Sequence, residues 1–253
     1  MDSLPVYDDE RIEKVNDNIR LIQKTGGLAY GTDAYMLAAF VRPQPRARAA
    51  ELGSGTGIVS LLCAEKQKLG HIFALEIHPG LADVGRRNIV LNGFEDKITQ
   101  LCADIRDIKP GELGGVLDVV FSNPPYMPVG QGKRCEQEIR NIARHETSGG
   151  IADFCEAAAR LLKQGGIFYV VWRPDRLVDL VTSLRQNRLE PKRMTFICPD
   201  VTSPPSVVLT EARLGAGPSL KITPPLVLYK GGSDSQPRIM TEKAARVYET
   251  CLL

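Results

Sequence analysis

The chain has 253 residues, of which 43% are hydrophobic and 25% charged, and its formal net charge is +2. A chain of this size can bury one full-sized core, and no Ser/Gly-rich linker divides it, so we expect a single domain over residues 1–253. The near-neutral charge permits a polyanionic partner without indicating one. No apolar run approaches the roughly 18 residues of a membrane-spanning helix, so we expect no contact with a membrane.

The six cysteines are scattered, with no Cys-x-x-Cys pair and no histidine at ligand spacing. Reduced thiols are typical of such a pattern, so we expect a cytoplasmic protein without a structural metal. The first residues are acidic and lack the apolar segment of a secretory signal, which agrees with that location.

Short β-branched runs alternate with helical patterns along most of the chain. In chain order we predict a helix at 34–40, a strand at 48–52, a helix at 58–67, a strand at 72–76, a helix at 79–91, strands at 98–102 and 117–122, a helix at 151–162, a strand at 167–171, a helix at 175–186, strands at 193–197 and 206–214, and a helix at 242–250. This alternation predicts an α/β fold with a doubly wound, mainly parallel sheet of seven strands. The last two strands leave no room for a crossover helix, so we expect an antiparallel strand at one edge.

A glycine-rich loop, Glu51-Leu52-Gly53-Ser54-Gly55-Thr56-Gly57, follows the first strand of this alternation. The glycines permit a sharp turn and the close approach of a ligand. Their Gly-x-Gly-x-Gly spacing differs from the dinucleotide fingerprint Gly-x-Gly-x-x-Gly. It resembles the S-adenosylmethionine loop of Rossmann-like methyltransferases. That resemblance implies cofactor contacts from Glu51, Gly53, Ser54, Gly55 and Gly57.

An acid at the end of the next strand, Glu76, is suited to accept hydrogen bonds from ribose hydroxyls, with Ile77 beside it. Such an acid also serves dinucleotides, so Glu76 alone does not identify the cofactor. Asp104 and Ile105 follow the third strand, and the same resemblance implies that they contact the adenine. Asp104 could instead make a turn or a helix cap. Thr32 could cap the helix at 34–40 or lie beside the methionine end of the cofactor.

The tetrapeptide Asn123-Pro124-Pro125-Tyr126 follows the strand at 117–122. The Asn123 side-chain oxygen and the Pro124 carbonyl can each accept one N–H of a planar amine, which aims the nitrogen lone pair and stabilises developing positive charge. Pro125 restricts the backbone, and Tyr126 offers a stacking face. This motif predicts methylation of an exocyclic or amide nitrogen, with Asn123, Pro124 and Tyr126 as the catalytic residues.

Six motifs occur in an order that resembles bacterial tRNA (adenine-N6)-methyltransferases acting on a valine tRNA: Tyr30-Gly31-Thr32-Asp33-Ala34, the glycine loop, Arg87-Asn88-Ile89-Val90-Leu91-Asn92, Asn123-Pro124-Pro125-Tyr126, Ala143-Arg144-His145-Glu146 and Pro224-Pro225-Leu226. The resemblance implies a Rossmann-like class I fold, S-adenosyl-L-methionine as cofactor and tRNA as partner. It spans roughly residues 16–230. Within the single domain we expect an N-terminal lead with a cofactor-side helix (1–45), a catalytic core (46–230) and a tail (231–253).

The sequence leaves other functions open. Protein-glutamine methyltransferases that act on release factors share Asn-Pro-Pro-Tyr but carry a helical substrate domain before the glycine loop, for which about fifty residues leave little room. A DNA adenine or rRNA guanine enzyme and a non-catalytic cofactor-binding subunit are further alternatives. For the tRNA itself we expect contacts from the long segment 127–144, with Lys133, Arg134 and Arg144, and from His145. A monomer is favoured, although the sequence does not determine the oligomeric state.

Overall fold

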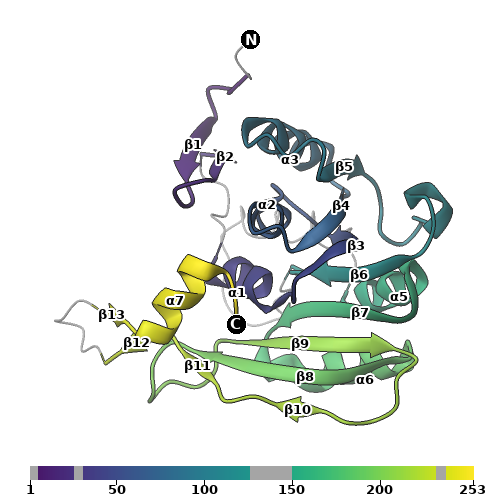
Figure 1. Cartoon of the computed structure of the whole chain (residues 1–253), viewed down its shortest axis with the longest axis vertical. Coiled ribbons are helices and arrows are strands. Elements are labelled where there is room, and N and C mark those ends of the chain that lie inside the picture. Colours follow the sequence, from purple (N-terminus) through teal and green to yellow (C-terminus); the bar gives the residue numbers. More distant parts are fainter. Residues whose placement is uncertain (1–4, 26–30, 126–149, 232–237) are drawn as a thin grey trace, which may run out of the picture.

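The computed structural model describes residues 5–25, 31–125, 150–231 and 238–253. Within these ranges a large sheet carries helices on both faces, and two small antiparallel strand pairs project from the body (Figure 1).

The described strands of the large sheet run in the order β10-β8-β9-β7-β6-β3-β4-β5, and β11 also pairs with β8. Their bounds are β3 Gln44–Leu52, β4 Leu69–Glu76, β5 Ile98–Cys102, β6 Leu117–Ser122, β7 Leu162–Trp172, β8 Leu189–Cys198, β9 Val207–Leu214, β10 Lys221–Ile222 and β11 Leu226–Val227. Neighbouring strands from β5 to β7 are parallel, whereas β9 runs antiparallel to both β7 and β8. The predicted α/β, mainly parallel sheet is confirmed.

The sheet differs from the prediction beyond β7, in the part formed by β8, β9, β10 and β11. The seven predicted strands are present among the nine described strands of this sheet, and the antiparallel one is β9, which lies between β7 and β8 and not at the edge as predicted. Helix α6 (Leu177–Gln186) returns the chain so that β8 is parallel to β7, and β9 then fits between them. The two-residue strands β10 and β11 pair in parallel with β8. Such short strands show no alternation of period two, so the sequence does not predict them.

The helices form two layers. One apolar core includes side chains of α1 (Thr32–Phe40), α2 (Ile58–Glu65), α3 (Pro79–Leu91) and α7 (Glu242–Thr250), and the other includes α5 (Ile151–Leu161), α6 and the short 3-10 helix η1 (Pro110–Leu113). A second 3-10 helix, η3 (Pro174–Arg176), leads into α6. Helix α2 ends earlier than predicted because Gln67 adopts a left-handed φ of 49°. None of the helices in the described ranges is long and apolar enough to cross a bilayer.

The N-terminal lead forms a hairpin, β1 (Glu10–Lys14) and β2 (Arg20–Lys24), which the sequence did not predict. A bidentate ion pair connects the hairpin to α3: Arg87 Nη1 lies 2.7 Å from Glu10 Oε2, and Arg87 Nη2 lies 2.7 Å from Glu10 Oε1. The Arg87 guanidinium also stacks 4.8 Å from the centre of the Tyr7 ring. Hydrogen bonding to Arg87 lowers the pKa of Glu10, so the charged pair anchors the hairpin.

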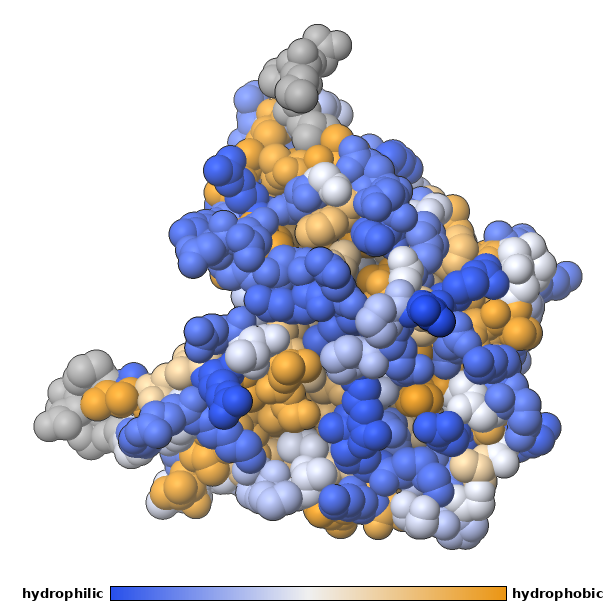
Figure 2. Space-filling model, in the orientation of Figure 1, coloured by the Kyte–Doolittle hydropathy of each residue, from blue (hydrophilic) through white to orange (hydrophobic). Residues whose placement is uncertain are grey.

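Helix α7 packs on α1 at the other end of this layer. The rings of Tyr35 and Tyr248 lie 4.9 Å apart, and a short strand pair, β12 (Tyr229–Lys230) with β13 (Ile239–Met240), extends beyond α7. Figure 2 shows the largely hydrophilic surface of this face and the hollow between the β1–β2 hairpin and the β12–β13 arm.

The carboxyl end of α1 has its unpaired carbonyls satisfied by distant basic side chains. Lys68, which is fully buried, donates from Nζ to the carbonyl oxygens of Ala38 (2.6 Å) and Val41 (2.8 Å). Arg193 Nη2 donates to the Phe40 carbonyl at 2.8 Å. The last carbonyls of a helix have no partner within the helix, so these contacts allow α1 to end inside the protein.

We therefore expect Lys68→Met to lower the free energy of unfolding by about 2–3 kcal/mol, because it leaves several buried carbonyls without a donor. Urea unfolding followed by circular dichroism measures the loss. The control is Lys97→Met, at an exposed lysine whose ion pair with Asp96 spans 3.8 Å. Equal stabilities for the two variants would contradict the capping role of Lys68.

Candidate functional site

The register of four parallel strands brings the predicted site residues to one edge of the sheet. Leu52 at the end of β3 pairs with Ser122 at the end of β6, and Ser122 Oγ donates to the Leu52 carbonyl at 2.7 Å. The glycine loop and the Asn-Pro-Pro segment therefore leave the sheet side by side. On the other side of β3, Leu52 pairs with Leu75, and Glu76 pairs with Cys102.

All three glycines of the loop adopt left-handed φ values, 68° at Gly53, 54° at Gly55 and 86° at Gly57. These values favour glycine, because other residues pay a steric cost there. A Cβ at Gly53 would lie 3.4 Å from the Phe154 ring, whereas a Cβ at Gly55 would meet no atom within 4 Å. Helix α5 thus supports the loop at Gly53, and open space remains over Gly55.

The Glu76 side chain is buried beside this open space. Its Oε2 accepts the Gly55 N–H at 2.8 Å, and its Oε1 accepts the His78 N–H at 2.9 Å. A carboxylate has about four acceptor positions, so two amides leave capacity for the hydroxyls of a ribose. The half-buried Ile77 follows directly. This geometry leaves room over Gly55 for the nucleoside part of a cofactor, and the contacts of Glu76 and Ile77 with it stay predictions.

Glu51 lies at the base of the loop and is almost fully buried. Its Oε2 accepts hydrogen bonds from the Ser60 N–H, at 3.0 Å, and from the Ser60 hydroxyl, which links the end of β3 to the first turn of α2. Burial raises the pKa of Glu51 from 4.5 to about 8, because desolvation outweighs these two hydrogen bonds. The observed partner of Glu51 is therefore α2, and its contact with a cofactor stays a prediction.

Asp104 makes a turn after β5. Its Oδ1 accepts the N–H of Arg106 at 2.9 Å, and both carboxylate oxygens bond to the Arg106 guanidinium, which lowers the pKa of Asp104. Ile105 is buried, and Arg160 of α5 donates to its carbonyl. The turn role considered for Asp104 is thus observed. Its carboxylate is 21% exposed and lies at the same edge as Glu76, where the adenine role remains a prediction.

Asn123 is half-buried, and its side chain has no hydrogen-bond partner among the described residues. Pro124 is buried and Pro125 half-buried. Five residues predicted to contact the substrate lie outside the described residues: Tyr126, Lys133, Arg134, Arg144 and His145.

Thr32 is the first residue of α1 and lies beside the same hollow as Tyr248 of α7. The two line a hollow of about 250 Å³ together with Val15, Gly31 and Tyr35. The N-terminus of α1 has no side-chain cap, so the capping role considered for Thr32 is not observed.

Sequence reasoning missed several residues that support the loop. Phe154 packs under Gly53, and Gln100 Nε2 donates to Ser54 Oγ at 3.1 Å. Asn88 of α3 donates to the Thr56 carbonyl at 3.0 Å. The motif Arg87–Asn92 was part of the family resemblance, and its two asparagines, four residues apart, were the signal from which the contact of Asn88 with the loop could have been predicted. No cluster of three or more potential metal ligands occurs in the parts of the chain that the structure describes.

The raised pKa of Glu51 predicts a pH dependence of stability. Between pH 4.5 and about 8 the folded carboxyl keeps a proton that the unfolded chain has lost, so its contribution to stability falls as the pH rises through this window. Glu51→Gln cannot ionise and should gain stability relative to wild type between pH 5 and pH 8, as measured by urea unfolding. Glu95→Gln, at an exposed glutamate, is the control. If the free energies of unfolding of Glu51→Gln and wild type changed with pH in the same way, the pKa of Glu51 would not be raised.

Comparison with known proteins places the chain among methyltransferases. It is 28% identical over 179 residues to a Bacteroides fragilis protein named tRNA1(Val) (adenine(37)-N6)-methyltransferase, covering 71% of this chain and 74% of that one. A Porphyromonas gingivalis protein of the same name is 28% identical over 199 residues, covering 76% and 77%.

Solved structures share the fold. The crystal structure of a predicted O-methyltransferase from Agrobacterium tumefaciens superposes with a TM-score of 0.68 at 21% identity, covering 87% of this chain and 97% of that one. Methanocaldococcus jannaschii TYW2, solved in complex with AdoMet, gives 0.57 at 15% identity, covering 82% and 86%. The family described as "Methyltransferase small domain" matches residues 26–185, more than half of the sequence. This chain belongs to the methyltransferase small domain family.

Proposed function

We propose that this protein methylates the exocyclic N6 amine of an adenine in tRNA, in the anticodon loop of a valine tRNA. The chain is an S-adenosylmethionine-dependent methyltransferase, as its family membership and fold establish. The names of the Bacteroides fragilis and Porphyromonas gingivalis relatives support the finer target. We place the activity in the cytoplasm, in agreement with the cysteine pattern.

The observation that carries this proposal is the juxtaposition of the Asn-Pro-Pro segment and the glycine loop. Both leave the sheet directly after the paired residues Leu52 and Ser122, which share a hydrogen bond. When bound, S-adenosylmethionine supplies a methyl group activated by a positively charged sulfur. Glu76 and Asp104 would hold the nucleoside part of the cofactor, for which the open space over Gly55 leaves room.

Asn123 and Pro124 perform the positioning that the chemistry requires. The lone pair of an adenine N6 amine is delocalised into the ring, so the amine is a weak nucleophile. Acceptance of its two N–H groups by Asn123 Oδ1 and the Pro124 carbonyl aims the lone pair and stabilises the developing positive charge. Tyr126, which lies outside the described residues, is the residue that we assign to stacking on the base. The proton leaves after transfer, so the site needs no strong general base.

The segment 127–145 supplies the proposed contacts with the tRNA backbone. Lys133, Arg134 and Arg144 are suited to phosphates, and His145 to the bound nucleotide. This part of the proposal rests on the sequence alone.

Asn123→Ala should lower kcat for methyl transfer by at least about 100-fold, because it removes an acceptor aimed at developing positive charge. The affinity for S-adenosylmethionine, measured by calorimetry, should stay unchanged. The melting temperature controls for misfolding. An Asn123→Ala protein that turns over at the wild-type rate would eliminate the proposed mechanism.

The target is tested by offering total tRNA, total protein and duplex DNA in parallel with methyl-labelled S-adenosylmethionine. We expect label in tRNA and N6-methyladenosine after digestion, concentrated in valine tRNA. Label in a release factor would replace the proposal with the glutamine alternative, and label in DNA would replace it with a DNA adenine target.

A further inference from the structure

One side chain of α3 connects the N-terminal hairpin to the glycine loop. Asn88 is fully buried, and its Nδ2 donates both to the Thr56 carbonyl, at 3.0 Å, and to the Ile22 carbonyl, at 3.1 Å. Its Oδ1 accepts the Ile22 N–H at 2.6 Å. Both amide hydrogens of Asn88 are therefore used, one on the loop and one on β2.

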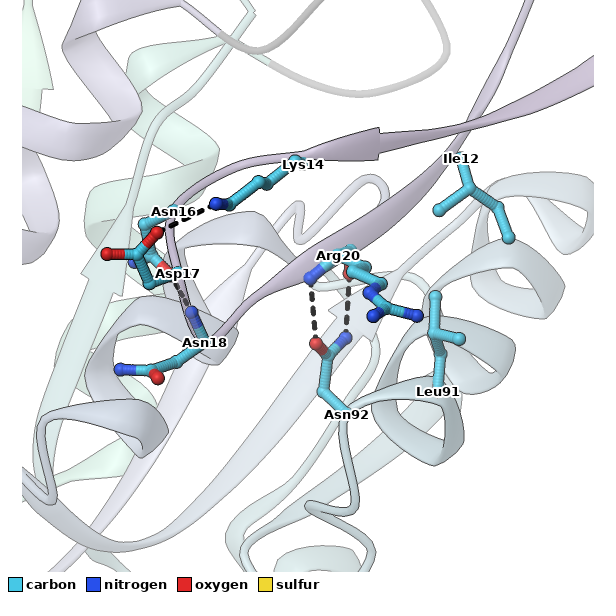
Figure 3. A pocket seen from close by; sticks show the side chains of 8 residues that line it. All are labelled: Ile12, Lys14, Asn16, Asp17, Asn18, Arg20, Leu91 and Asn92. Atoms are coloured by element: carbon cyan, nitrogen blue, oxygen red, sulfur yellow. Dashed lines mark hydrogen bonds and ion pairs between the residues drawn. The ribbon is translucent and has the colours of Figure 1, made fainter.

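Asn92, one helical turn later, repeats the contact with β2 but not the contact with the loop. Its Oδ1 accepts the Arg20 N–H at 2.9 Å, and its Nδ2 donates to the Arg20 carbonyl at 2.8 Å (Figure 3). The second hydrogen of Nδ2 goes to the Asn88 carbonyl at 2.7 Å. Asn88 and Asn92 thus hold alternate residues of β2 in the same way, and only Asn88 reaches the glycine loop.

The loop lies directly against α3 at this point. A Cβ at Gly85 would lie 3.4 Å from the Gly55 carbonyl oxygen, in van der Waals contact, so the helix backbone packs closely on the loop at this position. Thr56, which Asn88 holds, stands between the left-handed Gly55 and Gly57. Glycines have the largest choice of backbone conformations, so such a loop needs external contacts to stay in one of them.

We propose that Asn88 is a positioning residue for the cofactor: it holds the glycine loop in its binding conformation and couples that conformation to docking of the N-terminal hairpin. The inference rests on the proposed role of the loop in holding S-adenosylmethionine. A loop that is already ordered loses less conformational entropy when the cofactor binds. The contacts that order the loop therefore raise its affinity for the cofactor. Because such coupling is reciprocal, a bound cofactor also stabilises the hairpin.

The test compares Asn88→Ala with Asn92→Ala. Both variants lose the two hydrogen bonds to β2, so both should have lower melting temperatures. Only Asn88→Ala should weaken binding of S-adenosylmethionine in calorimetry, by about tenfold, the equivalent of one lost hydrogen bond. KM for the cofactor should rise in parallel while kcat at saturation stays at the wild-type value.

Hydrogen exchange provides a readout that does not depend on turnover. In the wild type and in Asn92→Ala, added S-adenosylmethionine should slow exchange of the backbone amides of the β1–β2 ladder. In Asn88→Ala the cofactor should protect the loop but not the hairpin. If Asn88→Ala does not fold, Asn88→Asp replaces it, since a carboxylate still accepts the Ile22 N–H but cannot donate to Thr56.

Glu76→Ala separates failure of this inference from failure of the proposed site. If Glu76→Ala weakens cofactor binding while the two asparagine variants bind equally well, the role of Asn88 is wrong and the site stands. If Glu76→Ala binds like wild type, the cofactor does not use this loop, and both proposals fall.

Discussion

The site depends on the parallel register of β6, β3, β4 and β5. Each of these strands ends at the same edge, and the strand ends together with the chain that follows carry the residues of the proposed site: Asn123, the glycine loop, Glu76 with its neighbours, and Asp104. A slip of one residue in any strand would turn its last side chain to the opposite face of the sheet. The hydrogen bond from Ser122 to Leu52 secures the register where the two halves of the site meet.

Buried polar groups then fix how the helices attach to this sheet. Lys68 ends α1, Glu51 holds the start of α2 through Ser60, and Asn88 connects α3 to the loop. In each case the buried group is matched to a backbone atom at a helix terminus or in a turn, where the chain has no partner of its own. These contacts are directional, unlike apolar packing, so they select one arrangement of the layers.

The sequence predicted those features that have a local signal. Alternation of β-branched and helical segments predicted the sheet, and glycine spacing predicted a loop whose φ values prove left-handed. The β1–β2 hairpin was missed because its residues are largely charged and α3 holds it through Arg87, Asn88 and Asn92, which follow much later in the chain. The packing of Tyr35 against Tyr248 and the support of Gly53 by Phe154 were missed for the same reason, since tertiary contacts leave no local pattern.

The attachment of β2 to α3 restricts amino-acid substitutions in α3 more than in β2. On the hairpin, Asn88 and Asn92 form hydrogen bonds with backbone atoms of Ile22 and Arg20, which every residue type except proline presents in full. Changes in the exposed side chains of the hairpin can therefore accumulate without loosening it, whereas the two asparagines tolerate little replacement. The hairpin is a part of the surface that can diverge in charge and shape while its position over the catalytic domain stays constant.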